Sequence, residues 1–263
     1  MEEILRAENL SVRYKENQVI KDLNLNICKG KIYSIIGPNG SGKTTLLRTL
    51  SRNIKPNKGK VFLNGENITG MKSKEIARKM AVLSQIHGSN TDVTVRNLVV
   101  YGRYAYKEWW KGDNEQDNSI VDWALETTKM KEFANKKMCN LSGGEKQRAW
   151  IAMAIAQKPD ILLLDEPTTF LDISHQLEVL ELVESLNKQN GITILMVLHD
   201  INLAAKYSDE LIVIKDGDVY IKGDPWEIVS EENLKDVFNI NGDISEDKES
   251  GKPIFFPRLV KRD

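Results

Sequence analysis

The chain has 263 residues, 41% of them hydrophobic and 29% charged, and it carries a formal net charge of -1 at pH 7. This length suffices for a sizeable buried core, and the balanced charge gives no electrostatic reason to expect nucleic acid as a main partner. The two cysteines, Cys28 and Cys139, show no metal-ligand spacing, which favours reduced thiols in a cytosolic protein. The N-terminal residues lack the apolar core of a signal peptide and the longest apolar runs are strand-sized, so we expect no membrane span.

The first quarter of the chain predicts a sheet that leads into a glycine-rich loop. Apolar and polar residues alternate at 10–14 and 23–27, which is typical of half-buried antiparallel strands. Residues 31–36 predict a short buried strand directly before the loop. The spacing after the loop predicts a helix at 43–54, and the chain then returns to the sheet as a strand at 60–65.

The middle of the chain, residues 89–140, predicts a mostly helical insertion. Its strand signal is confined to the β-branched segment 92–100. Beyond that segment aromatic and charged residues are mixed without alternation, as in "YGRYAYKEWWKGD" and "SIVDWALETTKM".

The last third of the chain alternates between helices and strands. Near-continuous Ile, Leu and Val predict buried strands at 160–167 and 191–200, and helical spacing predicts helices at 144–157 and 173–190. Strands separated by helices indicate a parallel sheet that is covered on both faces. A hairpin with an Asp-Gly turn is predicted at 209–224.

Residues 37–45, "GPNGSGKTT", complete the P-loop pattern G-x-x-x-x-G-K-[ST] between a predicted strand and a predicted helix. Glycines in such a loop turn backbone N–H groups toward phosphate oxygens, and the helix N-terminus adds its partial positive charge. We expect Lys43 to reach the β- and γ-phosphates and the Thr44 hydroxyl to bind Mg²⁺. The expected nucleotide contacts are Gly37, Pro38, Asn39, Gly40, Ser41, Gly42, Lys43, Thr44 and Thr45.

A second part of this site is predicted at 161–166, "ILLLDE", where a buried strand ends in two carboxylates. In open α/β sheets ligands bind at the carboxyl ends of the strands. Asp165 suits the Mg²⁺ shell, and Glu166 is placed to polarise a water for attack on the γ-phosphate. The alternative is that Asp165 and Glu166 are solvated side chains at the end of a strand, with no role in a site.

Three further residues carry weak signals when they are taken alone. His199, one of only three histidines, is expected to follow a strand at the carboxyl edge of the sheet, as Asp165 and Glu166 do. Taken alone, a histidine at a strand end is more often a solvated or capped side chain than a catalytic one. Gln85 ends a short apolar run. Tyr14 completes an alternating apolar face, so packing explains it as well as stacking on a nucleotide does.

The stretch "LSGGE", which is Leu141, Ser142, Gly143, Gly144 and Glu145, predicts a second helix start suited to an anion. Ser and Glu three residues apart form a capping box. The two glycines each cost up to about 1 kcal/mol of helix propensity, so they indicate a close approach of something to the backbone. Local pattern does not say whether the nucleotide that this loop would meet belongs to the same chain or to a neighbour.

Taken together, these motifs resemble those of the ATP-binding subunits of ABC transporters. The P-loop, Gln85, "LSGGEKQR", "ILLLDEP", "FLD" at 170–172 and His199 occur in the family's order, and the resemblance covers essentially the whole chain. "LSGG" is the signature of this family, whereas the P-loop is shared with many kinases and GTPases. The cofactors that the resemblance implies are ATP and Mg²⁺.

The resemblance implies a head-to-tail homodimer with two ATPs at its interface, each held by the P-loop of one protomer and the signature loop of the other. Ser142 and Gly144 would then contact the γ-phosphate in trans, and Asp172 would lie in the loop that crosses between the two sites. Tyr14 would stack on adenine, Gln85 would touch Mg²⁺ and the attacking water, and His199 would steady the γ-phosphate and Glu166. The chain departs from the family pattern at two positions: "FLD" replaces the commoner "ALD", and Glu145 stands where Gln is frequent. Both Glu and Gln can close the capping box with Ser142.

The expected fold class is α/β: a P-loop NTPase core, with a RecA-like parallel sheet flanked by helices, an N-terminal antiparallel β-subdomain and an inserted helical subdomain. We expect a single ABC domain over 1–263. Its predicted parts are a nucleotide-binding core at 1–88 and 150–240, a helical insertion with the signature loop at 89–149, and a C-terminal extension at 241–263.

Several longer segments resemble the ATPases of bacterial importers for ferric siderophores, haem and vitamin B12, the siderophore members above all. These segments are 101–106, 148–157, 165–183, 231–240 and 251–257. The resemblance implies integral-membrane permease subunits as partners, an indirect link to a substrate-binding lipoprotein or periplasmic protein, and a peripheral location at the cytoplasmic face of the cell membrane. Alternatives are the ATPase of a haem, vitamin B12 or metal importer, a soluble ABC-type ATPase, and a P-loop kinase. The last two fit less well, because the chain lacks tandem ATP domains or long coiled-coil insertions and a kinase has no use for a signature loop.

Overall fold

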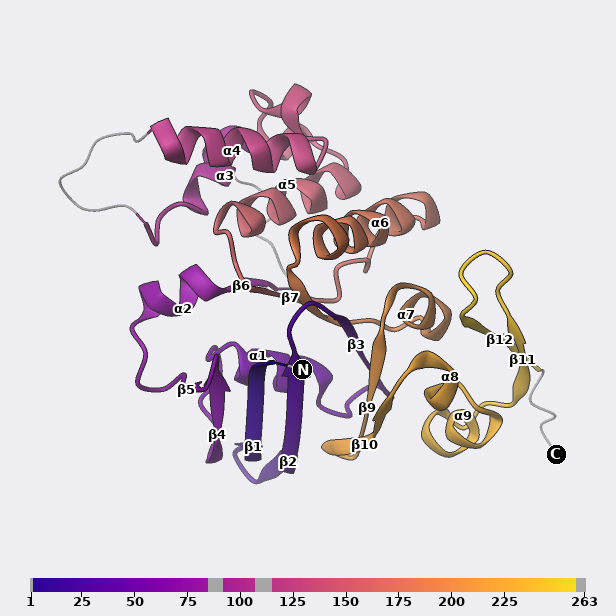
Figure 1. Cartoon of the computed structure of the whole chain (residues 1–263). Coiled ribbons are helices and arrows are strands. Elements are labelled where there is room, and N and C mark those ends of the chain that lie inside the picture. Colours follow the sequence, from indigo (N-terminus) through magenta and orange to yellow (C-terminus); the bar gives the residue numbers. More distant parts are fainter. Residues whose placement is uncertain (1, 85–91, 107–114, 259–263) are drawn as a thin grey trace. The chain divides into compact units, whose positions relative to one another are not determined.

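The computed structural model describes residues 2–84, 92–106 and 115–258, and the chain divides into two compact units (Figure 1). One unit combines Met1–Gly70 with Ile194–Asp263, and the other is Met71–Thr193. No helix in the described parts of the chain is both long and apolar enough to cross a bilayer.

The first unit begins with an antiparallel sheet in the order β2-β1-β4-β5. Its strands are β1 (Glu3–Tyr14), β2 (Asn17–Cys28), β4 (Lys58–Leu63) and β5 (Glu66–Asn67). Leu23, Leu25 and Ile27 of β2 are buried and alternate with exposed neighbours, as expected for a sheet with one face in the core. The predicted antiparallel strands are thus confirmed, and both extend well beyond the alternating segments.

The parallel part of this unit centres on β3, all five residues of which are buried. β3 (Ile32–Ile36) pairs in parallel with β8 (Thr193–Val197) on one side and with β9 (Glu210–Lys215) on the other. β9 continues into the antiparallel strand β10 (Asp218–Gly223). The turn between them has Asp216 and Gly217 at φ 51° and 87°, the left-handed conformations that a two-residue hairpin turn requires. This hairpin confirms the prediction from the Asp-Gly pair.

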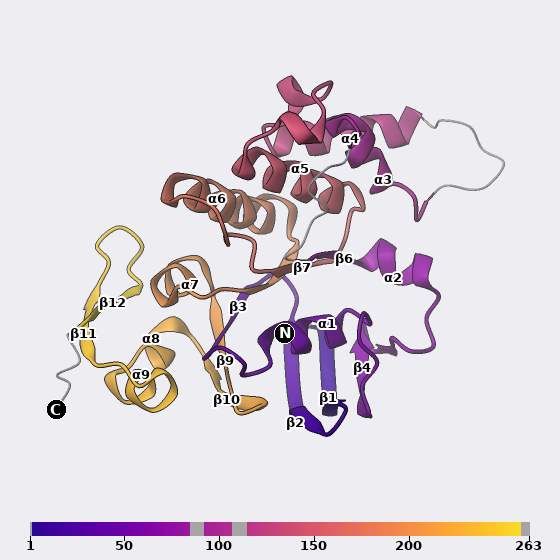
Figure 2. The same ribbon diagram turned by 180° about the vertical axis from the view of Figure 1, so that it is seen from behind.

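Short helices and a C-terminal hairpin complete the first unit. The hairpin lies beside α7 when the molecule is viewed from behind (Figure 2). The elements are α1 (Lys43–Leu50), α7 (Ile201–Tyr207), α8 (Pro225–Ile228), α9 (Glu231–Phe238), β11 (Gly242–Glu246) and β12 (Pro253–Pro257).

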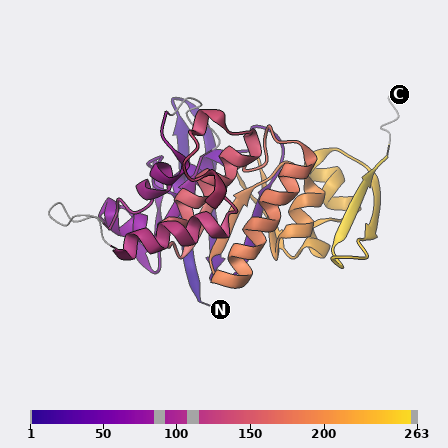
Figure 3. The same cartoon turned by 90° about the horizontal axis from the view of Figure 1, so that it is seen from above.

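The second unit consists of a parallel pair of strands and a group of helices (Figures 1 and 3). α5 (Gly143–Ala156) contacts α3 (Val95–Tyr101), α4 (Glu115–Thr127) and α6 (Ile173–Asn190) and forms the centre of the helical group. The α6 boundaries equal the predicted 173–190. The elements are α2 (Ser73–Lys79), β6 (Met80–Leu83), α3 (Val95–Tyr101), α4 (Glu115–Thr127), the 3₁₀ turns η1 (Lys131–Phe133) and η2 (Met138–Asn140), α5 (Gly143–Ala156), β7 (Ile161–Asp165) and α6 (Ile173–Asn190).

The strand signal at 92–100 was wrong, because residues 95–101 form helix α3. Thr94 caps this helix by accepting a hydrogen bond from the backbone N–H of Asn97 at 3.3 Å. Val95, Leu98 and Val99 are buried at helical spacing. Packing of this apolar stripe and the cap thus outweigh the β-propensity of the valines.

Candidate functional site

The P-loop connects β3 to α1, as its sequence predicts. Gly37 has φ 149°, and a Cβ at this position would lie 3.1 Å from the carbonyl carbon of Ile214 and closer still to its oxygen, so only glycine fits. At the end of the loop, Gly42 begins α1 in a left-handed conformation with no side chain capping the helix. The N-terminus of α1 is therefore open toward the loop, which is the arrangement that binds phosphate.

Two polar side chains of this loop are buried. Lys43 is 6% exposed, and its ammonium group donates to the carbonyl oxygens of Gly37 and Pro38, both at 2.8 Å. Ser41 is also 6% exposed, and its hydroxyl oxygen has no hydrogen-bond partner within the described parts of the chain. Because a buried hydroxyl without a partner costs about 1–3 kcal/mol, Ser41 indicates a ligand that supplies the missing hydrogen bond.

His199 lies at the same edge of the parallel sheet as the P-loop. β3 and β8 are parallel neighbours with Ile35 opposite Val197, so the loops that follow them leave the sheet side by side. His199 itself is exposed. The next residue, Asp200, caps α7 by accepting from the backbone N–H of Leu203 at 2.9 Å, which fixes the position of the histidine loop.

The carboxylates predicted for the site lie at the end of β7, in the second unit. Asp165 is the last residue of that strand and is 3% exposed. Glu166 follows in a left-handed conformation at φ 55°, which costs a residue other than glycine roughly 1–2 kcal/mol. Its carboxylate accepts a hydrogen bond from the Thr169 hydroxyl at 3.0 Å. Strain of this kind gathers at functional positions.

Two predicted nucleotide contacts, Tyr14 and Gln85, come from outside the P-loop and the strand-end carboxylates. Tyr14 ends β1 and is 48% exposed, so packing does not account for its ring. Gln85 falls in the segment 85–91, outside the parts of the chain that the structure describes.

The signature loop forms the N-terminus of α5, and the predicted capping box is confirmed. The Ser142 hydroxyl accepts from the backbone N–H of Glu145 at 3.3 Å, while the backbone N–H of Ser142 donates to the Glu145 carboxylate at 2.8 Å. Ser142 and Gly143 are exposed, and Leu141 and Gly144 are buried. The capping box therefore fixes the helix start, which is exposed to solvent at Ser142 and Gly143.

Asp172 caps the neighbouring helix α6. Its carboxylate accepts from the backbone N–H of His175 at 3.0 Å, from the ring Nδ1 of His175 at 2.7 Å and from the Ser174 hydroxyl at 2.9 Å. These hydrogen bonds, the backbone one first, hold the pKa of the Asp172 carboxyl below its usual value. The adjacent Phe170 and Ile173 are 94% and 77% exposed.

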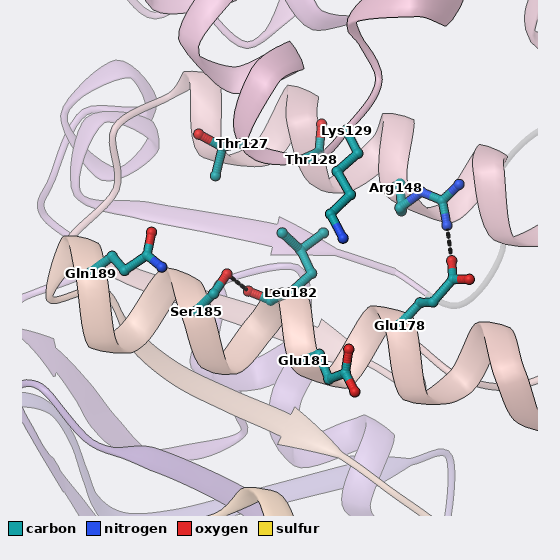
Figure 4. Close-up of a pocket in the computed structure, with 9 residues that line it drawn as sticks. All are labelled: Thr127, Thr128, Lys129, Arg148, Glu178, Glu181, Leu182, Ser185 and Gln189. Atoms are coloured by element: carbon teal, nitrogen blue, oxygen red, sulfur yellow. Dashed lines mark hydrogen bonds and ion pairs between the residues drawn. The ribbon is translucent and has the colours of Figure 1, made fainter.

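Sequence reasoning missed His175 and Ile173, and it did not predict the exposure of Phe170. The signal for His175 was its position three residues after a helix-capping aspartate. It also missed a cavity of about 320 Å³ against α6, whose lining carries charges of both signs (Figure 4). An ion pair between Arg148 of α5 and Glu178 of α6 forms part of its wall. The lining residues are Thr127, Thr128, Lys129, Arg148, Glu178, Glu181, Leu182, Ser185 and Gln189.

The parallel sheet and the open helix start behind its glycine-rich loop define a P-loop nucleotide-binding protein. The model of the ABC transporter family matches residues 20–169, and the chain belongs to this family as an ATP-binding protein.

Two curated relatives match almost the whole chain. The petrobactin import ATP-binding protein FpuC of Bacillus anthracis is 47% identical over 95% of this chain and 91% of its own. The iron(3+)-hydroxamate import ATP-binding protein FhuC of Bacillus subtilis (strain 168) is 46% identical, covering 95% and 93% of the two chains.

Two solved structures show the same fold. An inward-facing conformation of a metal-chelate type ABC transporter superimposes with a TM-score of 0.84 at 27% identity, covering 98% of both chains. The dimeric structure of a bacterial ABC transporter cassette gives a TM-score of 0.74 at 30% identity over 84% of this chain and 98% of that chain.

Proposed function

We propose that this chain is the ATP-hydrolysing subunit of a bacterial importer for ferric siderophores. The observation that carries the ATPase part is the presence of two helix starts suited to phosphate, the open one of α1 and the glycine-bearing one of α5. The choice of ferric siderophores is supported by the names of the relatives, which import petrobactin and iron(3+)-hydroxamate.

In the proposed reaction the P-loop holds ATP and Lys43 neutralises the β- and γ-phosphates as negative charge moves onto them. The Ser41 hydroxyl, buried without a partner in the described structure, is available to a phosphate oxygen. Glu166 accepts a proton from the attacking water, and His199 steadies the γ-phosphate and the Glu166 carboxylate. Tyr14 offers its exposed ring to the adenine.

The expected metal is Mg²⁺, which prefers hard oxygen ligands. The hydroxyl of Thr44 and the carboxylate of Asp165 match this preference, and Gln85 is the third predicted ligand. When bound, Mg²⁺ would neutralise charge on the β- and γ-phosphates.

A second copy of the chain completes each site in this proposal. Ser142 and Gly144 of one protomer meet the γ-phosphate held by the other, so that ATP closes a head-to-tail dimer and hydrolysis reopens it. The dimeric cassette among the similar structures supports this arrangement. Permease subunits hold the dimer at the cytoplasmic face of the membrane, which the likeness to a metal-chelate type ABC transporter supports. A binding protein delivers the substrate to these subunits.

The experiment that tests the function is reconstitution with the membrane subunits that co-purify with the chain. We expect ATP-dependent uptake of a labelled ferric siderophore, and no uptake when Lys43→Ala replaces the wild type. Uptake of labelled haem, vitamin B12 or a free metal ion in place of the siderophore would overturn the substrate class. A chain that hydrolyses ATP but with which no membrane subunit co-purifies, and which supports no uptake, would overturn the role in transport.

A further inference from the structure

His175, in the first turn of α6, contacts two loops that the proposed function places at the dimer interface. One is the signature loop at the start of α5, and the other is the loop that contains Asp172. All of these residues belong to the second unit of the chain. The imidazole is two-thirds buried, with 32% of its side-chain surface exposed.

The ring of His175 packs directly on the backbone of Gly144. A Cβ at Gly144 would lie 2.8 Å from Cγ of the ring and closer still to Cδ2. Real Cβ atoms do not approach so closely, so glycine at this position leaves just enough room for the imidazole. Gly143 lies near Leu171 in a looser contact, since Cδ2 of Leu171 would be 3.3 Å from an added Cβ. The backbone of the signature loop therefore packs against Leu171 and His175, which lie on either side of Asp172 in the sequence.

The same ring is fixed in orientation by Asp172. The Nδ1 atom lies 2.7 Å from Oδ1 of Asp172, and because the carboxylate accepts, Nδ1 carries the proton that it donates. The backbone N–H of His175 donates to the same oxygen at 3.0 Å. The ring is thus held by Asp172 at one atom and by the Gly144 backbone at its Cγ–Cδ2 edge.

We propose that His175 is a positioning residue that couples the signature loop to the Asp172 loop within one protomer. The ring sets the spacing between the two loops, so that the signature loop is held in place to meet the partner's ATP while the Asp172 loop crosses between the two sites. This inference rests on the proposed function, in which the signature loop acts in trans.

Two variants separate the two contacts of the ring. His175→Phe keeps a flat ring against Gly144 and removes the hydrogen bond to Asp172, whereas His175→Asn keeps a side-chain N–H donor and removes the ring. We expect kcat for ATP hydrolysis to fall by about tenfold in each variant. The KM for ATP should stay within about twofold of wild type, because the P-loop that binds ATP is untouched.

Glu178→Gln is the matched control, because it breaks the contact with Arg148 one turn further along the same two helices. It should leave kcat unchanged. Wild-type kcat in either His175 variant would overturn the coupling, since one contact alone would then suffice. An equal loss of kcat in Glu178→Gln would also overturn the coupling through His175, because the effect would then follow from breaking any contact between α5 and α6.

A measurement that does not depend on activity tests the contact itself. Gly144→Ala should lower the Tm of the wild-type chain, and it should lower the Tm of a His175→Ala chain by much less, because the ring that the new methyl group displaces is absent there. Equal losses in both backgrounds would overturn the contact. An inactive wild-type chain would overturn the proposed function and this role with it. An active wild type together with wild-type kcat in the Phe or the Asn variant would overturn the role of His175 alone.

Discussion

Glu166 follows β7 in a left-handed conformation because the turn after it is fixed by hydrogen bonds. The backbone N–H of Thr169 donates to the Glu166 carbonyl oxygen at 3.3 Å, and its hydroxyl donates to the carboxylate at 3.0 Å. The next turn is closed by the backbone N–H of Leu171, which donates to the carbonyl oxygen of Thr168 at 3.3 Å. A carboxylate held in this way is oriented before a substrate arrives, which is the requirement for a general base.

We predict that Glu166→Gln leaves ATP binding within about twofold of wild type and lowers turnover at least about 100-fold, because an amide keeps the shape but cannot take a proton. It should also stabilise an ATP-bound dimer, because hydrolysis no longer reopens it. Nucleotide binding, phosphate release and size-exclusion chromatography with ATP measure the three effects. Glu181→Gln, the same change at an exposed position of α6, is the control. Wild-type turnover of Glu166→Gln would remove this residue from the role of base.

Residues whose role depends on a local pattern could be predicted from the sequence, and residues whose role depends on packing could not. The P-loop position and the Ser142–Glu145 capping box involve neighbours within a few residues, and both were predicted. The left-handed conformation of Glu166 and the contact between His175 and Gly144 depend on the turn after β7 and on how α5 packs against α6. No periodicity in the sequence records that packing.

The C-terminal hairpin of β11 and β12 is attached to α7 by side-chain hydrogen bonds to its backbone. Asn202 of α7 forms a pair with Phe255, in which its amide nitrogen donates to the carbonyl oxygen at 3.0 Å and the backbone N–H donates back to its oxygen at 2.7 Å. Trp226 donates to the carbonyl oxygen of Gly251 at 3.0 Å, and Lys252 donates to that of Ser208 at 3.1 Å. The sequence predicted an extension at 241–263 but no fold for it, because partners far apart in sequence hold it.

We predict that Asn202→Ala lowers the free energy of unfolding by about 1–3 kcal/mol, because it leaves the N–H and C=O of a half-buried strand unpaired. Urea unfolding monitored by tryptophan fluorescence measures this loss. Asn53→Ala, at an exposed turn in the same unit, should change the stability by less than about 0.5 kcal/mol. Equal effects of the two substitutions would mean that the hairpin is not held through Asn202.

The face that carries the signature loop also exposes large apolar side chains. Phe170 and Ile173 are 94% and 77% exposed on either side of Leu171 and Asp172, and Leu171 lies against the Gly143 backbone. Exposed apolar groups beside an exposed polar backbone are typical of a protein interface. The family motifs predicted this face as the dimer interface. The structure of a single chain does not test the proposed burial of a second copy against this face, because a composite site would be formed by two chains.

Two substitutions in different arrangements test whether the ATP site is shared between protomers. Ser142→Arg blocks the signature loop and Lys43→Ala disables the P-loop, so each homodimer should be inactive. A mixed dimer that carries one substitution in each protomer joins an intact P-loop to an intact signature loop at one of its two sites. We predict that its turnover exceeds that of both homodimers and reaches up to about half of the wild-type value.

The matched control places both substitutions in one chain and pairs that chain with wild type. If the site is shared, the intact P-loop of the wild-type protomer faces a damaged signature loop, and its intact signature loop faces a damaged P-loop. This dimer should therefore be inactive although one of its protomers is unaltered. If each protomer acted alone, the result would be reversed: the wild-type protomer would hydrolyse ATP here, and the dimer with separated substitutions would not. Because the two dimers contain the same substitutions in the same number, differences in folding or ATP affinity cannot produce this reversal. Purification of each dimer through two different tags, followed by phosphate release with saturating ATP, decides between the two arrangements.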